Sequence, residues 1–247
     1  MLHTLMLALA LGASPADSIR TGEDLIRAMH ARYQGQWYEN LVLIQAVTYF
    51  DLQSGALDSA RLWYESIQLP GTVRSDIAPV EAGHYQLFRD GTWHIFEADT
   101  LARANPGPHP VLLLGFDVYM QPVEETLSKL ALLQFDLVGL REDTWQGREV
   151  YVVGSATDDR ANQFWVDKED LLLRRLIIVS RTSGAAIEVQ FNDYRPLGGG
   201  WIAAELVFLR DGHLWLHERY AYWDIDVEFE PSIFATTERT RPTWVGR

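Results

Sequence analysis

The feature that most constrains the fold is a run of short, β-branched and aromatic segments between residues 162 and 210. Only brief turn sequences separate these segments, which span residues 162–167, 172–181, 186–194 and 201–210. Gaps of this length favour hairpins, so neighbouring strands are expected to pair antiparallel. In the third segment Ile187, Val189 and Phe191 alternate with polar residues. This alternation predicts a sheet with one dry face and one wet face.

The first half of the chain repeats this pattern of strands and turns. Asp90 and Gly91 are a strong signal for a two-residue hairpin between two of its strands. The strands expected in this half are residues 40–51, 60–69, 72–77, 84–89 and 92–97. In the second half, further strands are expected on either side of the central run, at residues 135–140, 148–154 and 213–226.

The arrangement of these strands predicts the fold class. No parallel strand–helix–strand rhythm and no fixed-period repeat is visible along the sequence. We therefore expect an α+β fold with a large antiparallel sheet of about 10–12 strands. A sheet of this size with few helices tends to curl, so helices are expected to cover its concave face.

Two amphipathic helices are expected to cover that concave face. The first begins after Thr21, which can cap it, and its apolar stripe includes Leu25 and Met29 at helical spacing. The second begins at Pro122, a residue that is favoured in the first turn of a helix because its missing N–H needs no partner there.

A proline-rich segment and the most apolar stretch of the mature chain lie between the two groups of strands. Residues 105–110 contain three prolines and are expected to be irregular. Residues 112–120 follow, and two interpretations of them stay open. They can be a buried core helix or strand, or they can form a lid that covers a cavity when it is empty and lines it when it is full. Met29 and Met120 suit a cavity of variable content, because methionine adapts its shape.

The N-terminus indicates export. Residues 5–11 are apolar and uncharged, and the small residues of 12–16 follow them. This pattern is typical of a signal peptide, which we place at residues 1–16, with cleavage after Ala16. The apolar run is much shorter than the roughly 20 residues of a spanning helix, so an exported, soluble protein is expected. Residues 17–235 are expected to form a single domain, and residues 236–247 a loose C-terminal tail.

Charge and composition exclude several classes of function. The formal net charge of −13 argues against binding to nucleic acid or to anionic membrane surfaces, because both would repel the chain. The absence of cysteine excludes disulfides, thiolate metal sites and a cysteine nucleophile. No nucleophile elbow, phosphate-binding loop, dinucleotide fingerprint or zinc-protease helix is present. We therefore expect neither catalysis nor a cofactor.

No pattern of residues favours a metal site. On a strand, the spacing of His213 and His217 separates them by roughly 13 Å, too far to share one ion. His84 and His94 lie on neighbouring expected strands without a cluster of carboxylates around them. The acidic residues of the last strand alternate on one face and are expected to be solvated: Asp224, Asp226, Glu228 and Glu230.

Several local motifs, in this order, resemble a known family. A Trp–x–Asp strand end at Trp165–Asp167 precedes an apolar and basic strand that starts at Leu172. The glycine-rich turn of residues 198–200 precedes Trp201, and residues 227–234 close the fold. Together with the overall layout, these motifs resemble the periplasmic lipoprotein-carrier superfamily of LolA, LolB and the outer-membrane lipoprotein-sorting proteins. Ala203 departs from the family pattern, in which a proline often stands.

The resemblance implies an incomplete antiparallel barrel whose hydrophobic concave side shields the acyl chains of lipids or lipoproteins. The function expected is a monomeric periplasmic carrier for lipoprotein sorting or lipid transport, with a membrane-bound donor or acceptor protein as a candidate partner. The residues expected to bind the lipid are Leu25, Met29, Leu113, Phe116 and Met120. Trp165 and Trp201 join them on the strength of the family motif.

Two other functions are considered beside the carrier. The same fold could serve as an envelope-stress sensor or a protein–protein interaction module, without a transported ligand. A packed interior with an exposed apolar patch would favour that alternative, whereas an apolar cavity of several hundred Å³ would favour lipid. An enzyme of unrecognised type ranks last, and convergent buried titratable groups in a cleft would favour it.

Overall fold

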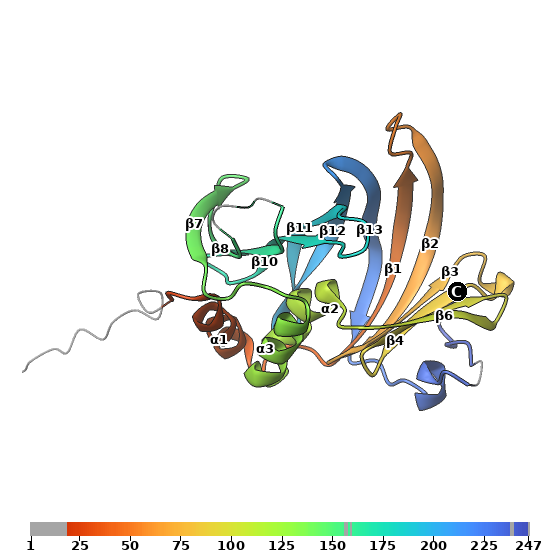
Figure 1. The fold of residues 1–247 in the computed structure, drawn as a ribbon. Coiled ribbons are helices and arrows are strands. Elements are labelled where there is room, and N and C mark those ends of the chain that lie inside the picture. Colours follow the sequence, from red (N-terminus) through yellow and green to blue (C-terminus); the bar gives the residue numbers. More distant parts are fainter. Residues whose placement is uncertain (1–18, 156–157, 159, 238–239, 247) are drawn as a thin grey trace, which may run out of the picture.

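A computed structural model describes residues 19–155, 158, 160–237 and 240–246. The predicted signal peptide at residues 1–16 lies outside the described residues. The described part forms one antiparallel sheet of 13 strands in the order β6-β5-β4-β3-β2-β1-β13-β12-β11-β10-β9-β8-β7 (Figure 1). The edge strands β6 and β7 do not pair with each other, so the sheet is curled but not closed into a barrel. The predicted α+β incomplete barrel is confirmed.

The strands of the first half are β1 (Asn40–Phe50), β2 (Leu57–Gln68), β3 (Thr72–Ile77), β4 (Tyr85–Arg89), β5 (Thr92–Glu97) and β6 (Thr100–Pro106). Those of the second half are β7 (Leu140–Trp145), β8 (Arg148–Val153), β9 (Gln163–Asp167), β10 (Leu173–Val179), β11 (Ala186–Leu197), β12 (Gly200–Arg210) and β13 (His213–Ile225). Each half is a meander, and the pairing of β1 with β13 joins the two halves into one sheet.

Three α-helices gather on one side of the sheet (Figure 1) and define its concave face. They are α1 (Gly22–Tyr33), α2 (Pro110–Gly115) and α3 (Val123–Leu132), with a short 3-10 turn, η3 (Asp117–Tyr119), after α2. Thr21 caps α1 as expected: its hydroxyl accepts from the Asp24 N–H, and the Asp24 carboxylate accepts from the Thr21 N–H in return. None of the described helices is long and apolar enough to cross a membrane.

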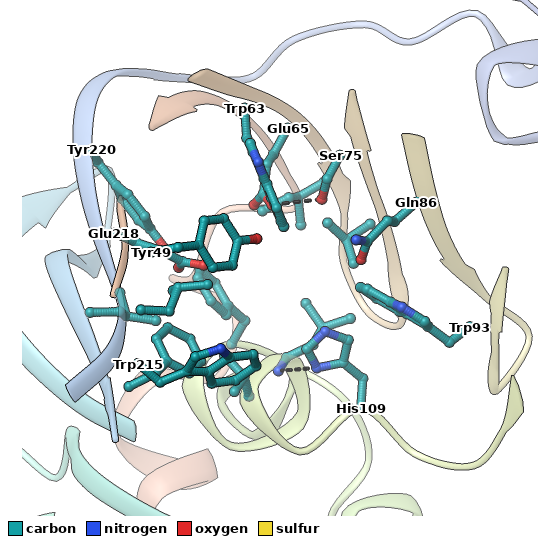
Figure 2. Close-up of a pocket in the computed structure, with 18 residues that line it drawn as sticks. Tyr49, Trp63, Glu65, Ser75, Gln86, Trp93, His109, Trp215, Glu218 and Tyr220 are labelled. Atoms are coloured by element: carbon teal, nitrogen blue, oxygen red, sulfur yellow. Dashed lines mark hydrogen bonds between the residues drawn. The ribbon is translucent and has the colours of Figure 1, made fainter. Parts of the chain in front are cut away.

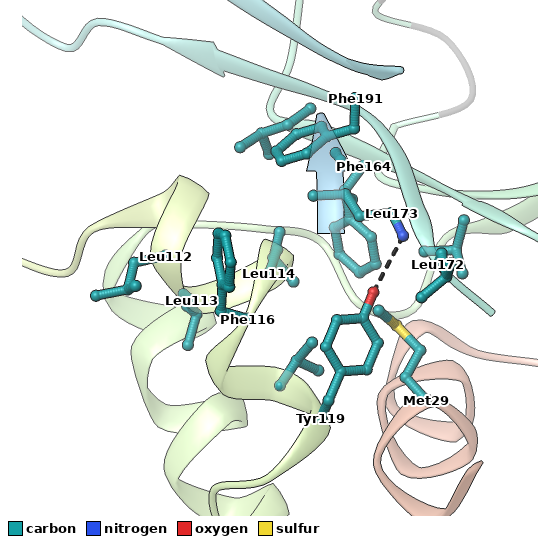
Figure 3. Close-up of a cluster of buried hydrophobic side chains, with 14 of the residues drawn as sticks. Met29, Leu112, Leu113, Leu114, Phe116, Tyr119, Phe164, Leu172, Leu173 and Phe191 are labelled. Carbon is teal, nitrogen blue, oxygen red and sulfur yellow. Dashed lines mark hydrogen bonds between the residues drawn. The ribbon is translucent and has the colours of Figure 1, made fainter. Parts of the chain in front are cut away.

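Under the second half of the sheet, the helices pack on the concave face. Leu25 and Met29 of α1 are fully buried against Phe164 and Leu173 of the strands. Tyr119 of η3 lies between them and accepts a hydrogen bond from the Leu173 N–H at 3.1 Å (Figure 3). Its ring stacks on Trp37 with centroids 4.1 Å apart. These side chains are buried, in a region that we call the closed core.

The opposite, convex face of the first-half strands has a small core of its own. Tyr85, Leu87 and Phe96 pack there against Ile233 and Phe234 from the short 3-10 helix η4 (Pro231–Phe234). The C-terminal segment thus returns to the outside of β3 and β4, as Figure 1 shows.

Part of the C-terminal tail, which the sequence predicts to be loose, packs on this convex face. Val245 is 8% exposed, and the Trp244 indole N–H donates to the Ser66 hydroxyl at 3.1 Å. The Arg241 guanidinium donates to the Val80 carbonyl at 2.9 Å. Apolar side chains among polar residues, and not the overall polarity of the tail, decide where it lies.

Three expectations about strand boundaries are wrong. Residues 135–139 are not a strand; β7 begins at Leu140 because Gln146 and Gly147, both with positive φ, close a two-residue hairpin to β8. Residues 105–106 are not irregular, since β6 runs to Pro106, and an edge strand tolerates proline because it has a free side. The last strand ends at Ile225, and Asp226 has a φ of 61°, so the acidic residues do not continue along one strand face.

Candidate functional site

A cavity of about 380 Å³ lies between the concave face of the first-half sheet and helix α2 (Figure 2). Its walls come from strands β1–β5, β12 and β13, and its floor comes from α2 and the residues that flank it. The lining side chains are Tyr49, Trp63, Glu65, Ile67, Val73, Ser75, Gln86, Trp93, His109, Val111, Leu112, Phe116, Leu206, Phe208, Trp215, Leu216, Glu218 and Tyr220.

Strand alternation builds the walls of this cavity. On β2, every second residue faces inward, which brings Trp63, Glu65 and Ile67 to one face. The partner of Glu65 on β3 is Ser75, and β13 contributes Glu218 by the same rule. The inward face thus mixes large apolar and aromatic side chains with a few acidic and hydroxyl groups.

His109 closes one side of the cavity and positions its floor. Its Nδ1 accepts from the Leu112 N–H at 3.2 Å and so caps the N-terminus of α2. The imidazole lies edge-on to Phe88 and Trp93, with ring centroids 5.3 and 4.8 Å away. Burial lowers the pKa of His109 from 6.5 to about 4, so the ring is neutral at pH 7 and remains a hydrogen-bond acceptor for the helix.

Two carboxyl groups face into the cavity. Glu65 accepts from the Ser75 hydroxyl at 2.6 Å and from the Gln45 amide Nε2 at 3.2 Å. Burial raises the pKa of Glu65 from 4.5 to about 7, although the Ser75 hydrogen bond opposes this shift. Burial also raises the pKa of Glu218 well above its ordinary value, and the nearby charge of Glu65 adds to the effect. Neither carboxyl is paired with a basic side chain of the described residues.

The structure separates the residues that the sequence places together in a lipid site. Phe116 lines the cavity, whereas Leu25 and Met29 lie in the closed core under the second half of the sheet. Met120 is partly buried against that same core. Leu113 lines a second hollow of about 490 Å³ on the other side of α2, which also contains His109 and Asp117.

The two tryptophans of the family motif lie away from the cavity. Trp165 alternates with the core residues Phe164 and Val166 and packs on the convex face with Trp145. The Arg175 guanidinium lies 4.6 Å from its ring centroid on that face. Trp201 borders the closed core and a separate hollow of about 300 Å³. Phe116 is thus the one predicted site residue that the structure places in the 380 Å³ cavity.

Most of the cavity-lining residues were not identifiable from the sequence. Trp63, Glu65, Glu218 and Tyr220 belong to strands whose alternation is weak, because both faces carry aromatic and charged residues. The available signal was a glutamate two positions away from Trp63 and another two positions away from Tyr220, on the same strand face. An acidic residue on an otherwise aromatic face is unusual.

The histidines considered for metal binding do not form a metal centre. His217 Nε2 lies 2.9 Å from the Glu205 carboxylate, and His94 lies beside the Leu87 carbonyl. Within the part of the chain that the structure describes, no group of three or more His, Cys, Asp or Glu side chains is arranged to hold an ion.

The Glu65 carboxyl predicts a pH-dependent stability. Its pKa in the folded protein, about 7, lies above its ordinary value of 4.5, so the folded state binds the proton more tightly. The stability that this proton supplies is fully present below pH 4.5 and is lost as the pH rises through 7. The free energy of unfolding of Glu65→Gln should therefore be about 1–3 kcal/mol higher than that of the wild type at pH 8. At pH 4.5 the substitution should raise it little.

Urea unfolding at the two pH values measures this difference. Glu205→Gln is the matched control, because Glu205 is a strand glutamate that pairs with His217 and Arg219 outside the cavity. An equal gain for Glu65→Gln at both pH values would contradict the burial of an ionisable Glu65.

Comparison with solved structures shows a known fold. A putative outer membrane lipoprotein-sorting protein domain from Vibrio parahaemolyticus is similar at a TM-score of 0.61 and 15% identity, over 89% of this chain and 97% of that one. A LolA superfamily protein from Nitrosomonas europaea is similar at a TM-score of 0.54 and 9% identity, over 85% and 97%. A DUF1329 family protein from Desulfovibrio piger is similar at a TM-score of 0.57 and 14% identity, over 91% and 98%.

These similarities extend over most of the chain and show that it has the fold of the LolA superfamily. No family model matches the sequence, and no curated protein matches it either.

Proposed function

We propose that this protein is a periplasmic carrier that shelters the acyl chain of a lipid or lipoprotein in the cavity above α2. The observation that carries the proposal is the cavity itself, whose volume of about 380 Å³ lies within the range of small-molecule sites, roughly 300–1,000 Å³. Its apolar residues include Leu112, Phe116, Leu206 and Phe208. The shared fold with a lipoprotein-sorting domain supports the same function.

The physical basis of binding is the transfer of methylene groups out of water. Each buried methylene gains ~0.8 kcal/mol, so a chain of ten gains on the order of 8 kcal/mol before the ordering costs of binding. An affinity of this size needs no catalytic group. A signal peptide would bring the carrier to the periplasm, where it would act as a monomer and exchange its cargo with a membrane-bound donor or acceptor.

The alternative of an interaction module is less well supported. The edge strand β6 is exposed along its whole length and could pair with another chain. However, it carries Arg103 and Pro106, and charged and proline residues are the usual means by which proteins prevent pairing at an edge. The open cavity thus favours the carrier.

An enzyme is also less well supported, although Glu65, Glu218 and His109 converge on one cavity. No hydrogen bond joins any two of these three side chains in the described structure, and His109 Nδ1 is already engaged by the helix that it caps. A catalytic acid–base pair needs groups within hydrogen-bond reach of each other or of one reacting atom.

The experiment that tests the carrier is a cavity-filling substitution. Val111→Trp places an indole from α2 into the cavity that Val111 lines. We expect this variant to bind the neutral probe 1-decanol at least about tenfold more weakly than the wild type, by titration calorimetry. Native mass spectrometry of protein purified from a membrane-containing lysate should show bound lipid on the wild type and little on the variant.

Val123→Trp is the matched control, because Val123 is a partly buried valine at the start of α3 that packs on the closed core. It should bind 1-decanol like the wild type. If the wild type shows no lipid and no decanol binding, the carrier function is wrong.

A further inference from the structure

The inner wall of the cavity has a chemical character that an acyl chain alone does not require. Besides Phe116 and Phe208, five tyrosine and tryptophan side chains line it: Tyr49, Trp63, Trp93, Trp215 and Tyr220. Figure 2 shows that Tyr49, Tyr220 and Trp215 lie around Glu218, while Trp63 lies beside Glu65. Carboxyl groups among aromatic faces are the arrangement by which proteins bind organic cations.

The two carboxyls on this wall differ in their hydrogen-bond partners. Glu65 receives hydrogen bonds from Ser75 and Gln45, while Glu218 receives none from the residues that the structure describes. A partly buried acceptor without a donor is costly, so Glu218 is the carboxyl on this wall that lacks a donor.

No basic side chain supplies that donor. None of the lining residues is lysine or arginine, and His109 has a lowered pKa and is neutral. Burial raises the pKa of Tyr49, and the charge of Arg61, an exposed residue of β2, opposes this larger effect, but Arg61 does not line the cavity. The titratable groups that face the two carboxyls are therefore Tyr49, Tyr220 and His109, and none of these is positively charged at neutral pH.

We propose that the cavity selects an amphiphile whose head group is an organic cation, either an amine or a quaternary ammonium. Glu65 and Glu218 serve as counter-ions of the head group, and the ring faces of Tyr49, Trp63 and Tyr220 contact it. Leu112 and Phe116 cover the acyl chain. This inference rests on the proposed function, since it assigns the head group of the cargo whose chain occupies the same cavity. When they are ionised, the same two carboxyls repel anionic amphiphiles such as fatty acids.

Binding of a cationic head group is expected to depend on pH. An empty cavity favours the protonated carboxyls, because burial raises their pKa, to about 7 for Glu65. A bound cation favours the ionised carboxyls, so binding releases protons and strengthens as the pH rises from 6 to 8. A neutral amphiphile has no such dependence on these groups, and an anionic one binds more weakly as the pH rises.

The test compares three amphiphiles of equal chain length on the full chain by titration calorimetry: decyltrimethylammonium, 1-decanol and decanoate. At pH 8 we expect the cation to bind about tenfold more tightly than the alcohol, and decanoate more weakly than either. In the double variant Glu65→Gln/Glu218→Gln, the cation should lose this advantage over the alcohol. The affinity of this variant for 1-decanol should stay within about twofold of the wild-type value. Glu205→Gln on the neighbouring strand, which lies outside the cavity, is the control and should behave as the wild type.

The outcomes separate this inference from the function on which it rests. If 1-decanol binds but the cation has no advantage, or keeps its advantage in the double variant, the cationic head group is wrong and the carrier function stands. If none of the three amphiphiles binds, both proposals fail. If tetramethylammonium binds as tightly as decyltrimethylammonium, the cation site is supported and the acyl-chain carrier is overturned. Proton release, measured in buffers of different ionisation enthalpy, should accompany the cation and not the alcohol.

Discussion

Replacing Arg74 by methionine is expected to lower the free energy of unfolding by about 3–5 kcal/mol, because it leaves a buried aspartate without its partner. Arg74 is 1% exposed and makes two hydrogen bonds of 2.8 Å to the Asp76 carboxylate. Its remaining N–H groups donate to the carbonyls of Ile233 and Thr240, each at 2.7 Å. This one side chain therefore attaches the C-terminal segment to the convex face of β3.

Urea unfolding of Arg74→Met measures the loss. Arg195→Met is the control, because Arg195 pairs with Asp193 at the surface, where about half of each side chain is exposed. Such a pair contributes about 0–1 kcal/mol. The double variant Arg74→Met/Asp76→Leu should recover much of the loss, since it removes the unpaired carboxylate as well. A loss below about 1 kcal/mol for Arg74→Met would contradict a buried, fully satisfied Arg74.

Leu25→Ala is expected to lower the free energy of unfolding by about 2–5 kcal/mol and to leave the affinity for 1-decanol within about twofold. Leu25 is 0% exposed in the closed core beneath the second half of the sheet, where its removal leaves a void that rigid neighbours cannot fill. Because the cavity lies against other strands, the loss in stability should not change ligand binding.

The matched control is Leu132→Ala, a helical leucine of α3 that is 69% exposed and should cost less than about 0.5 kcal/mol. Thermal unfolding, together with calorimetry of 1-decanol binding, measures both quantities on the same samples. A large loss of decanol affinity in Leu25→Ala, at a temperature where the variant is folded, would place the ligand in the helical core after all.

Local patterns in the sequence predicted most of the strands and their antiparallel pairing, but not β6 or the bounds of β7. Asp90–Gly91 closes the β4–β5 hairpin, and residues 186–194 form most of β11. Both signals are local, because turn chemistry and period-two alternation depend on residues a few positions apart. The helix after Thr21 was predicted for the same reason. The errors occurred where a local rule has exceptions, as at Pro106 on an edge strand.

The sequence by itself determined a curled antiparallel sheet with helices on one face, but only the tertiary structure decided which part of that face stays open. Leu25 and Phe116 are both apolar and both buried, yet one fills the core and the other lines the cavity. The difference depends on where the helical segments lie relative to strands distant in the sequence, as in the hydrogen bond from the Leu173 N–H to the Tyr119 hydroxyl, across 54 residues. Glu65 and Glu218 meet the same cavity for this reason too, because strand order in the sheet, and not distance along the chain, brings β2 and β13 to either side of β1.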